Sequence, residues 1–107
     1  MTDRIVADAL SELRTRLQQL YGERLRGLYL FGSFARDEAG DESDVDVLIL
    51  LDEVTSASAE INRTSFVIAD LSLKYDLPLS RVIVPEERWK NSEDLFFQNV
   101  RQEAVPA

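Results

Sequence analysis

Apolar residues in the first part of the chain recur with the period of an α-helix. They stand at Ile5, Val6, Ala9, Leu10, Leu13, Leu17 and Leu20, with polar residues between them. Apolar positions spaced three and four apart fall on one face of a helix. Gly22 stands where such a helix would end. The pattern therefore predicts an amphipathic helix from Asp3 to about Leu20.

Two apolar runs after this helix predict neighbouring β-strands. The first, RGLYLFG, covers residues 26–32, and the second, DVDVLILLD, covers residues 44–52. Beyond Asp46 the second run is apolar on both faces, which is typical of a central strand. The polar residues 34–43 between the runs, with Gly40, predict a turn or a one-turn helix. Because this connection is shorter than a usual parallel crossover, we expect the two strands to be antiparallel.

The second half of the chain predicts a long helix, a third strand and a helical C-terminal region. Residues 56–75 are compatible with a loosely amphipathic helix, and LSRVIV at 79–84 is typical of a short strand. Pro85 and Glu86 are typical of a helix start. The last helix is expected over residues 92–103. Its expected inner face carries Leu95, Phe96, Asn99 and Val100.

The expected order of elements, α-β-turn-β-α-β-α, indicates an α/β or α+β domain on a small sheet. We expect residues 1–107 to form one domain, because no repeat, low-complexity tract or linker divides them. Hydrophobic residues make up 45% and charged residues 30%, which is a globular composition. No apolar run approaches the length of about 18 residues that a membrane helix needs. Asp3, Asp8 and Glu12 make the amino terminus unlike a signal peptide, so we expect a soluble cytoplasmic protein.

Cysteine and histidine are both absent, which limits the available chemistry. Disulfides, thiol nucleophiles, Ser-His-Asp triads and histidine-ligated zinc are excluded. Any catalysis must therefore use carboxylates, hydroxyls, Lys, Arg or a bound metal. The net charge of −8 makes long nucleic acid a poor partner, because Lys and Arg contacts to phosphate dominate that affinity. Solubility alone is an equally good explanation of the acidic balance.

The second strand begins with two carboxylates on one face. Asp44 and Asp46 are two residues apart, and side chains at that spacing point to the same side of a strand. Carboxylates so close together repel each other unless a cation lies between them. Mg²⁺ commonly binds through one or two carboxylates together with the phosphates of a substrate. The alternative is a solvated acidic turn at the edge of a strand.

An antiparallel pairing would place the end of the first strand beside these two aspartates. There, Gly32 lets a phosphate approach the backbone, and Ser33 offers a hydroxyl and an amide. Arg36 is a candidate for a charge-assisted phosphate contact, or else a surface residue of an acidic loop. Gly-Ser and Asp-x-Asp are each common turn sequences, whereas their joint spacing between two apolar strands is more specific. No Gly-Lys-Ser or Gly-Lys-Thr occurs, which excludes a P-loop.

The stretch GSFARDEAGDESDVD resembles the signature of the DNA polymerase β-like nucleotidyltransferase superfamily, and the short chain is similar to its minimal nucleotidyltransferase (MNT) branch. The resemblance implies a mixed sheet of three or four strands packed with about four helices. It also implies Mg²⁺-dependent transfer of a nucleoside monophosphate, AMP from ATP, to a hydroxyl of a protein or a small molecule. Gly32 and Ser33 would hold the triphosphate, while Asp44 and Asp46 would bind Mg²⁺. Many MNT proteins are antitoxins encoded beside a HEPN-domain toxin, some adenylylating it, so the resemblance implies a HEPN-type partner.

In this superfamily a third carboxylate on the next strand completes a two-metal site and helps to deprotonate the attacking hydroxyl. A long helix joins the second and third strands, so we expect them to be parallel, with the start of the third beside Asp44 and Asp46. That position falls at or near Ser80, which cannot replace a carboxylate at neutral pH. Asp76 is the candidate substitute, and its alternative role is capping the turn before Pro78. The competing hypothesis for the whole chain is a catalytically degenerate binding module that covers a partner.

Aromatic residues near the C-terminus have two interpretations each. Phe97, in the run DLFFQNVRQEAVPA, is a candidate for an oligomer or partner interface on the C-terminal helix, or for core packing. Trp89 is a candidate for stacking on a base, or for core packing.

Overall fold

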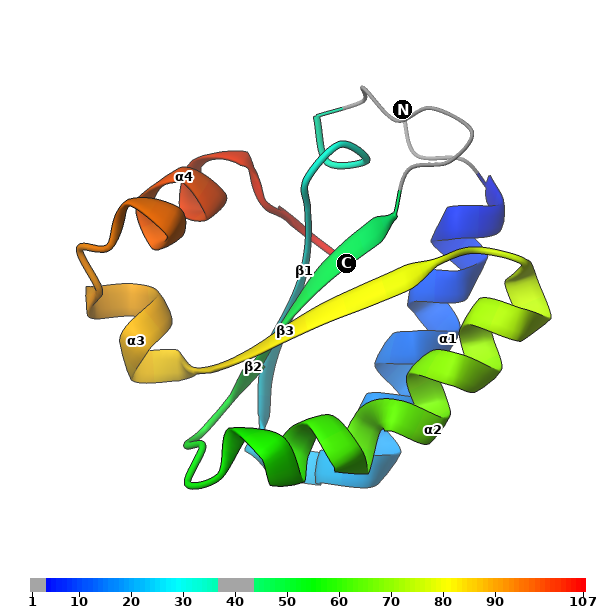
Figure 1. The fold of residues 1–107 in the computed structure, drawn as a ribbon, viewed down its shortest axis with the longest axis horizontal. Helices are drawn as coiled ribbons and strands as arrows, with labels where there is room; N and C mark the ends of the chain where they lie inside the picture. The colour runs from blue at the N-terminus through cyan, green and yellow to red at the C-terminus, as the bar shows by residue number, and fades with distance from the viewer. Residues whose placement is uncertain (1–3, 37–43) are drawn as a thin grey trace.

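The computed structural model describes residues 4–36 and 44–107, which form a 4-stranded sheet in the order β3-β2-β1-β4 with helices on both faces (Figure 1). The elements are α1 (Arg4–Tyr21), the 3-10 turn η1 (Gly22–Arg24), β1 (Leu25–Phe31), β2 (Val45–Leu51), α2 (Ala57–Tyr75), β3 (Leu79–Pro85), α3 (Glu86–Asn91), α4 (Leu95–Glu103) and β4 (Val105–Pro106). Helices α1 and α2 cover one face, and α3 and α4 lie on the other. The mixed α+β class expected from the sequence is confirmed.

Strand β2 is central, as its apolar run predicts, and every residue of it except Asp46 is buried. It pairs antiparallel with β1, where Leu30 lies opposite Val47. It pairs parallel with β3, where Leu48 lies opposite Val82. Both predicted strand directions are confirmed. The alternation of β2 side chains supplies two cores, one under α1 and α2 and the other under α3 and α4.

Helix α2 uses a different face from the one its apolar residues suggest. Ser56 caps its start by accepting a hydrogen bond from the Ala59 backbone nitrogen at 3.3 Å. Ile61, Phe66 and Leu73 are exposed rather than buried. The buried positions are Glu60, Thr64, Val67, Ile68 and Leu71. The apolar residues of α2 therefore do not by themselves mark its buried face, because the polar residues Glu60 and Thr64 take core positions.

Glu60 is buried because other elements supply hydrogen bonds to both of its oxygens. Tyr21 Oη donates to Glu60 Oε1 at 2.9 Å, and Arg24 Nη2 donates to Glu60 Oε2 at 3.1 Å. Arg24 Nε also donates to Asp52 Oδ1 at 3.1 Å. Burial by itself would raise the pKa of Glu60, but the hydrogen bonds from Tyr21 and Arg24, with the nearby guanidinium charges, lower it overall. This network joins α1, η1, α2 and the residue that follows β2, at the end of the sheet where β1 begins.

The C-terminal region differs from its prediction in two ways, at the start of the last helix and in a short fourth strand. The last helix starts at Leu95 rather than Ser92, whereas α3 begins at Glu86 and confirms the helix start expected at Pro85 and Glu86. The two-residue strand β4, which the apolar pattern does not predict, pairs with β1. Phe97 and Trp89 are both buried, so the structure favours the core alternative for each and not an interface or a base-stacking role. Trp89 stacks on Tyr29 with ring centroids 5.2 Å apart. Within the described ranges, no helix combines the length and the apolar content needed to cross a membrane.

Candidate functional site

The end of β1 and the start of β2 meet at the pair Phe31 and Asp46, which are partners in the antiparallel register. Gly32 follows with a positive φ of 76°, a conformation that residues with a Cβ rarely adopt. A Cβ at Gly32 would lie 2.3 Å from Asp46 Oδ2, so only glycine lets this carboxylate approach the backbone there. The Gly-Ser and Asp-x-Asp halves of the sequence motif are therefore in direct contact at residues 32 and 46.

A single helical turn follows the strand. The Arg36 backbone nitrogen donates to the Gly32 carbonyl oxygen at 3.2 Å, and Ser33 lies half-buried inside the turn. The turn therefore places Gly32, Ser33 and Arg36 within one short segment, as a phosphate site would require. The rest of the expected polar segment, residues 37–43, lies outside the described residues.

Asp46 is half-buried and Asp44 is exposed at the entry of β2. Burial raises the pKa of Asp46, and the negative charges of Asp44 and Glu103 raise it further. The positive charge of Arg36 lowers it, but the net pKa is raised. Two hard carboxylate donors of this kind fit Mg²⁺, which takes its other oxygens from water and substrate phosphates. Among residues 4–36 and 44–107, no group of three or more acidic residues is arranged to hold a metal. Within those ranges, Asp44 and Asp46 are the carboxylates that could hold a metal at this end of β2.

Ser80 occupies the position that sequence reasoning gives it. It is the direct parallel partner of Asp46, and Val45 N donates to the Pro78 carbonyl oxygen at 2.8 Å just before it. Asp76 ends α2 with a left-handed φ of 52°, and its backbone nitrogen bonds to Leu73 O and Ser72 O. It therefore has the predicted capping role, and the described residues do not bring it together with Asp44 and Asp46 in a three-carboxylate cluster.

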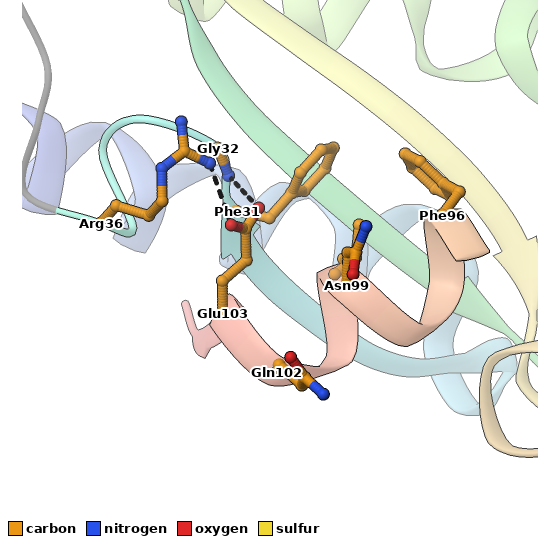
Figure 2. Close-up of a pocket in the computed structure, with 8 residues that line it drawn as sticks. Phe31, Gly32, Arg36, Phe96, Asn99, Gln102 and Glu103 are labelled. Carbon is orange, nitrogen blue, oxygen red and sulfur yellow. Dashed lines mark hydrogen bonds and ion pairs between the residues drawn. The ribbon is translucent and has the colours of Figure 1, made fainter.

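A cavity of about 590 Å³ opens beside Gly32, between the end of β1 and helix α4 (Figure 2). Its lining residues are Phe31, Gly32, Arg36, Phe96, Asn99, Val100, Gln102 and Glu103. Phe31 and Phe96 meet edge to face with centroids 6.2 Å apart. The volume lies in the usual range for small-molecule sites. Sequence reasoning missed this wall of α4 as a site, although the spacing of residues 96, 99, 100 and 103 on one helical face is visible in the sequence.

Glu103 is the part of this wall that reaches the motif. Its Oε1 accepts a hydrogen bond from the Gly32 backbone nitrogen at 3.2 Å, and its Oε2 accepts from Arg36 Nη1 at 2.9 Å. Figure 2 shows both contacts converging on the one carboxylate. The side chain is 24% exposed. An acidic residue thus occupies donors that are suited to an anion.

The chain is similar in sequence to proteins of one family. The sequence profile of the family described as "Nucleotidyltransferase domain" matches residues 10–101. Protein adenylyltransferase MntA of Thermococcus cleftensis is 33% identical over 72 residues, covering 67% of this chain and 71% of that protein. A Methanocaldococcus jannaschii protein assigned as a protein adenylyltransferase is 30% identical over 96 residues, covering 89% of this chain and 90% of that protein.

Solved structures share the fold at low sequence identity. A structure assigned to a minimal nucleotidyltransferase superposes with a TM-score of 0.67 at 20% identity, covering 100% of this chain and 97% of that one. A toxin-antitoxin structure with AMP-PNP gives a TM-score of 0.60 at 18% identity, covering 89% of this chain and 69% of that one.

Proposed function

The chain belongs to the nucleotidyltransferase domain family, in the minimal branch of the DNA polymerase β-like superfamily, and we propose on this basis that it transfers AMP from ATP to a hydroxyl group. The observation that carries the proposal is the contact between Gly32 and Asp46. It puts a backbone amide suited to phosphate next to a carboxylate suited to Mg²⁺. A metal-bound triphosphate needs both kinds of group side by side.

Each motif residue has a role in the proposed reaction. Gly32, Ser33 and Arg36 bind the phosphates and orient the triphosphate. Asp44 and Asp46 would hold Mg²⁺, which when bound neutralises phosphate charge as the bond to the leaving group breaks. The acceptor oxygen bonds to the α-phosphorus, pyrophosphate leaves, and the hydroxyl proton goes to a base. Asp76 is the chain's candidate base, and it would have to act from its place at the end of α2.

The acceptor we propose is a hydroxyl on a protein, specifically a HEPN-type toxin for which this chain would be the antitoxin. Two findings on related proteins support this choice. The similar Thermococcus protein is named as a protein adenylyltransferase, and a neighbour in fold is a toxin-antitoxin structure with an ATP analogue. The net charge of −8 also favours a protein over a nucleic acid as the macromolecular partner.

A second candidate function follows from Ser80. Because the strand partner of Asp46 carries a hydroxyl and not a carboxylate, the chain lacks a general base at that position. The alternative is a degenerate member of the family that binds nucleotide or metal, or only a partner protein, without transferring AMP.

Transfer of label from ATP to a partner distinguishes the two functions. Purified chain is incubated with ATP labelled at the α-phosphate, Mg²⁺ and a HEPN-type protein, and labelled protein is measured. We expect transfer that disappears in Asp44→Ala combined with Asp46→Ala and persists in Asp8→Ala, an exposed aspartate on α1. Removal of Mg²⁺ with a chelator should have the same effect as the double substitution.

Two results would contradict the proposal in different degrees. Mg²⁺-dependent ATP binding without transfer leaves the degenerate nucleotide-binding module. Neither transfer nor Mg²⁺-dependent binding overturns the nucleotide site, and leaves a chain that acts through protein contacts alone.

A further inference from the structure

Glu103 places a carboxylate where the proposed function needs a phosphate. Its two oxygens are bonded to the Gly32 backbone nitrogen at 3.2 Å and to Arg36 Nη1 at 2.9 Å. A carboxylate and a phosphate oxygen are both anionic acceptors, and they use the same N–H donors. One donor cannot serve both anions at full strength, so the Glu103 side chain and a triphosphate compete for this position.

The position of Glu103 in its own helix indicates that these contacts hold it. It is the last residue of α4, where the helix dipole is negative and an acidic side chain is unfavourable. Local preference would direct this carboxylate into solvent. Its contacts with Gly32 and Arg36, 71 and 67 residues away in sequence, keep it at the cavity instead. The tertiary bonds therefore outweigh the local electrostatics.

The backbone next to Glu103 is fixed, so only its side chain needs to move. Directly after α4, the strand β4 pairs with β1 through Val105 opposite Leu30. The Ala104 backbone nitrogen also bonds to Val100 O at 2.8 Å, which closes the end of the helix. Rotation of the Glu103 side chain away from Gly32 would thus open the position without unfolding α4.

We propose that Glu103 is an internal competitor of the nucleotide, a carboxylate that occupies the triphosphate position and must leave before the phosphates bind. The inference rests on the proposed function, because it requires that Gly32 and Arg36 receive phosphate. The inference adds to that function a residue that sets nucleotide affinity. It also adds a way to regulate that affinity. A partner that binds the Glu103 carboxylate and turns it away from Gly32 would increase nucleotide binding with no change in the motif itself.

The expected effect of removing Glu103 follows from the population of the open state. A site that is open in a fraction of molecules binds its ligand with an affinity reduced by that fraction. If the carboxylate is in place in about nine molecules of ten, then Glu103→Gln should tighten binding about tenfold. Glu103→Ala should tighten it at least as much, because alanine leaves no acceptor at all.

Calorimetric titration with inorganic tripolyphosphate, and with Mg²⁺ and a non-hydrolysable ATP analogue, measures this effect. The matched control is Glu23→Gln, which removes the same charge from an exposed residue of η1 at the opposite end of β1. We expect Glu23→Gln to bind both probes like the wild type. Adenosine, which has no phosphate, should bind equally to the wild type and to Glu103→Gln. The competition concerns only the N–H groups that would bind phosphate.

The contact with Arg36 supplies a second test. In an Arg36→Ala background one of the two donors is absent, so Glu103→Gln should increase tripolyphosphate affinity by a smaller factor than it does in the wild type. Thermal unfolding of each variant checks that it is folded. A coupling of this kind would not follow from a general change in charge.

The outcomes separate the inference from the proposed function. The first outcome is that the wild type binds tripolyphosphate and that Glu103→Gln and Glu103→Ala bind it no more tightly. This result overturns the competitor role and leaves the proposed function intact. An equal gain in Glu23→Gln overturns it as well, because the effect would then be one of net charge. No binding of either probe to any form overturns the proposed triphosphate site, and the competitor role with it.

Discussion

Asp46 on β2 and Ser80 on β3 are direct partners in a parallel register. Paired residues of neighbouring strands place their side chains on the same face of a sheet, so a side chain at position 80 starts beside the Asp46 carboxylate. Ser80 is exposed. A longer acidic side chain could therefore be introduced there without disturbing the core.

Replacing Ser80 by aspartate should supply the carboxylate that the site lacks. We expect Ser80→Asp to bind Mg²⁺ more tightly and to raise the rate of AMP transfer by about tenfold or more, since a positioned general base contributes about 10²–10⁴. Mg²⁺ titration and label transfer from ATP measure the two effects. Ser80→Asn introduces a side chain of the same size as aspartate but without charge, so it should show neither the tighter Mg²⁺ binding nor the faster transfer. Equal behaviour of the two variants would mean that this strand position is not where a third carboxylate acts.

Asp76 is the natural alternative, and a substitution that preserves its backbone can test it. Asparagine tolerates the left-handed conformation at the end of α2, so Asp76→Asn removes only the charge. If Asp76 is the base, the transfer rate should fall by about 10²-fold or more. An unchanged rate would remove Asp76 from the catalytic set and leave its capping role alone.

Gly32→Ala should destabilise the fold more than the same change at Gly22. Both glycines have positive φ, so each substitution introduces backbone strain of about 1–2 kcal/mol. At Gly22 a Cβ would meet nothing within 4 Å, whereas at Gly32 it would collide with Asp46 Oδ2. Urea unfolding of the two variants measures the difference, which isolates the contact with Asp46. Equal losses would mean that Asp46 moves away without cost.

Phe96 and Phe97 are adjacent but should respond oppositely to truncation. Phe97 is 4% exposed in the core beneath α4, so Phe97→Ala should lower the free energy of unfolding by about 3–5 kcal/mol. Phe96 is 46% exposed and lines the cavity, so Phe96→Ala should cost less, about 0.5–1.5 kcal/mol for each of its ring contacts with Phe31 and Phe97. Phe96→Ala should instead weaken binding of an ATP analogue. Chemical denaturation and titration together check both parts.

Glu60→Gln should destabilise the chain and change its response to acid. Loss of the charge weakens the bonds from Tyr21 and Arg24, at a cost of about 1–3 kcal/mol near neutral pH. Because the folded pKa of Glu60 lies below its ordinary value of 4.5, its contribution is present above that value and is lost as the pH falls through the lowered pKa.

The stability difference between wild type and Glu60→Gln should therefore shrink as the pH drops below about 4.5. Unfolding curves at several pH values measure it, and Glu23→Gln, at an exposed position, serves as the control for charge. A difference that stays constant with pH would show that the carboxylate of Glu60 is not what stabilises the network.

Much of the fold could be predicted because β2 is apolar on both faces. That property identifies the central strand, and the lengths of its two connections then give both strand directions and the place of Ser80. Counting along a strand is reliable because side chains alternate strictly.

Contacts between distant segments could not be read from local patterns. Glu60 is buried only because Tyr21 and Arg24 reach it from another part of the chain. Glu103, at the end of its helix, resembles any solvated acidic residue until Gly32 is placed beside it. The strand β4 has two residues, one of them proline, and carries no periodic signal.

The place of β2 between β1 and β3 also affects how amide hydrogen exchange at the site would change when a ligand binds. Amide hydrogens of β2 are covered on both sides, so they should exchange with solvent only when a large part of the fold opens. The turn after Gly32 lies outside the sheet, and among the described residues its backbone is closed by the bond from Arg36 to Gly32, so local opening suffices there. The aspartates are thus attached to a strand that should exchange slowly, and the proposed phosphate-binding residues to a turn that should open more readily. Protection that a nucleotide adds should therefore be seen first at Ser33 and its neighbours in the turn, with β2 already near its maximum.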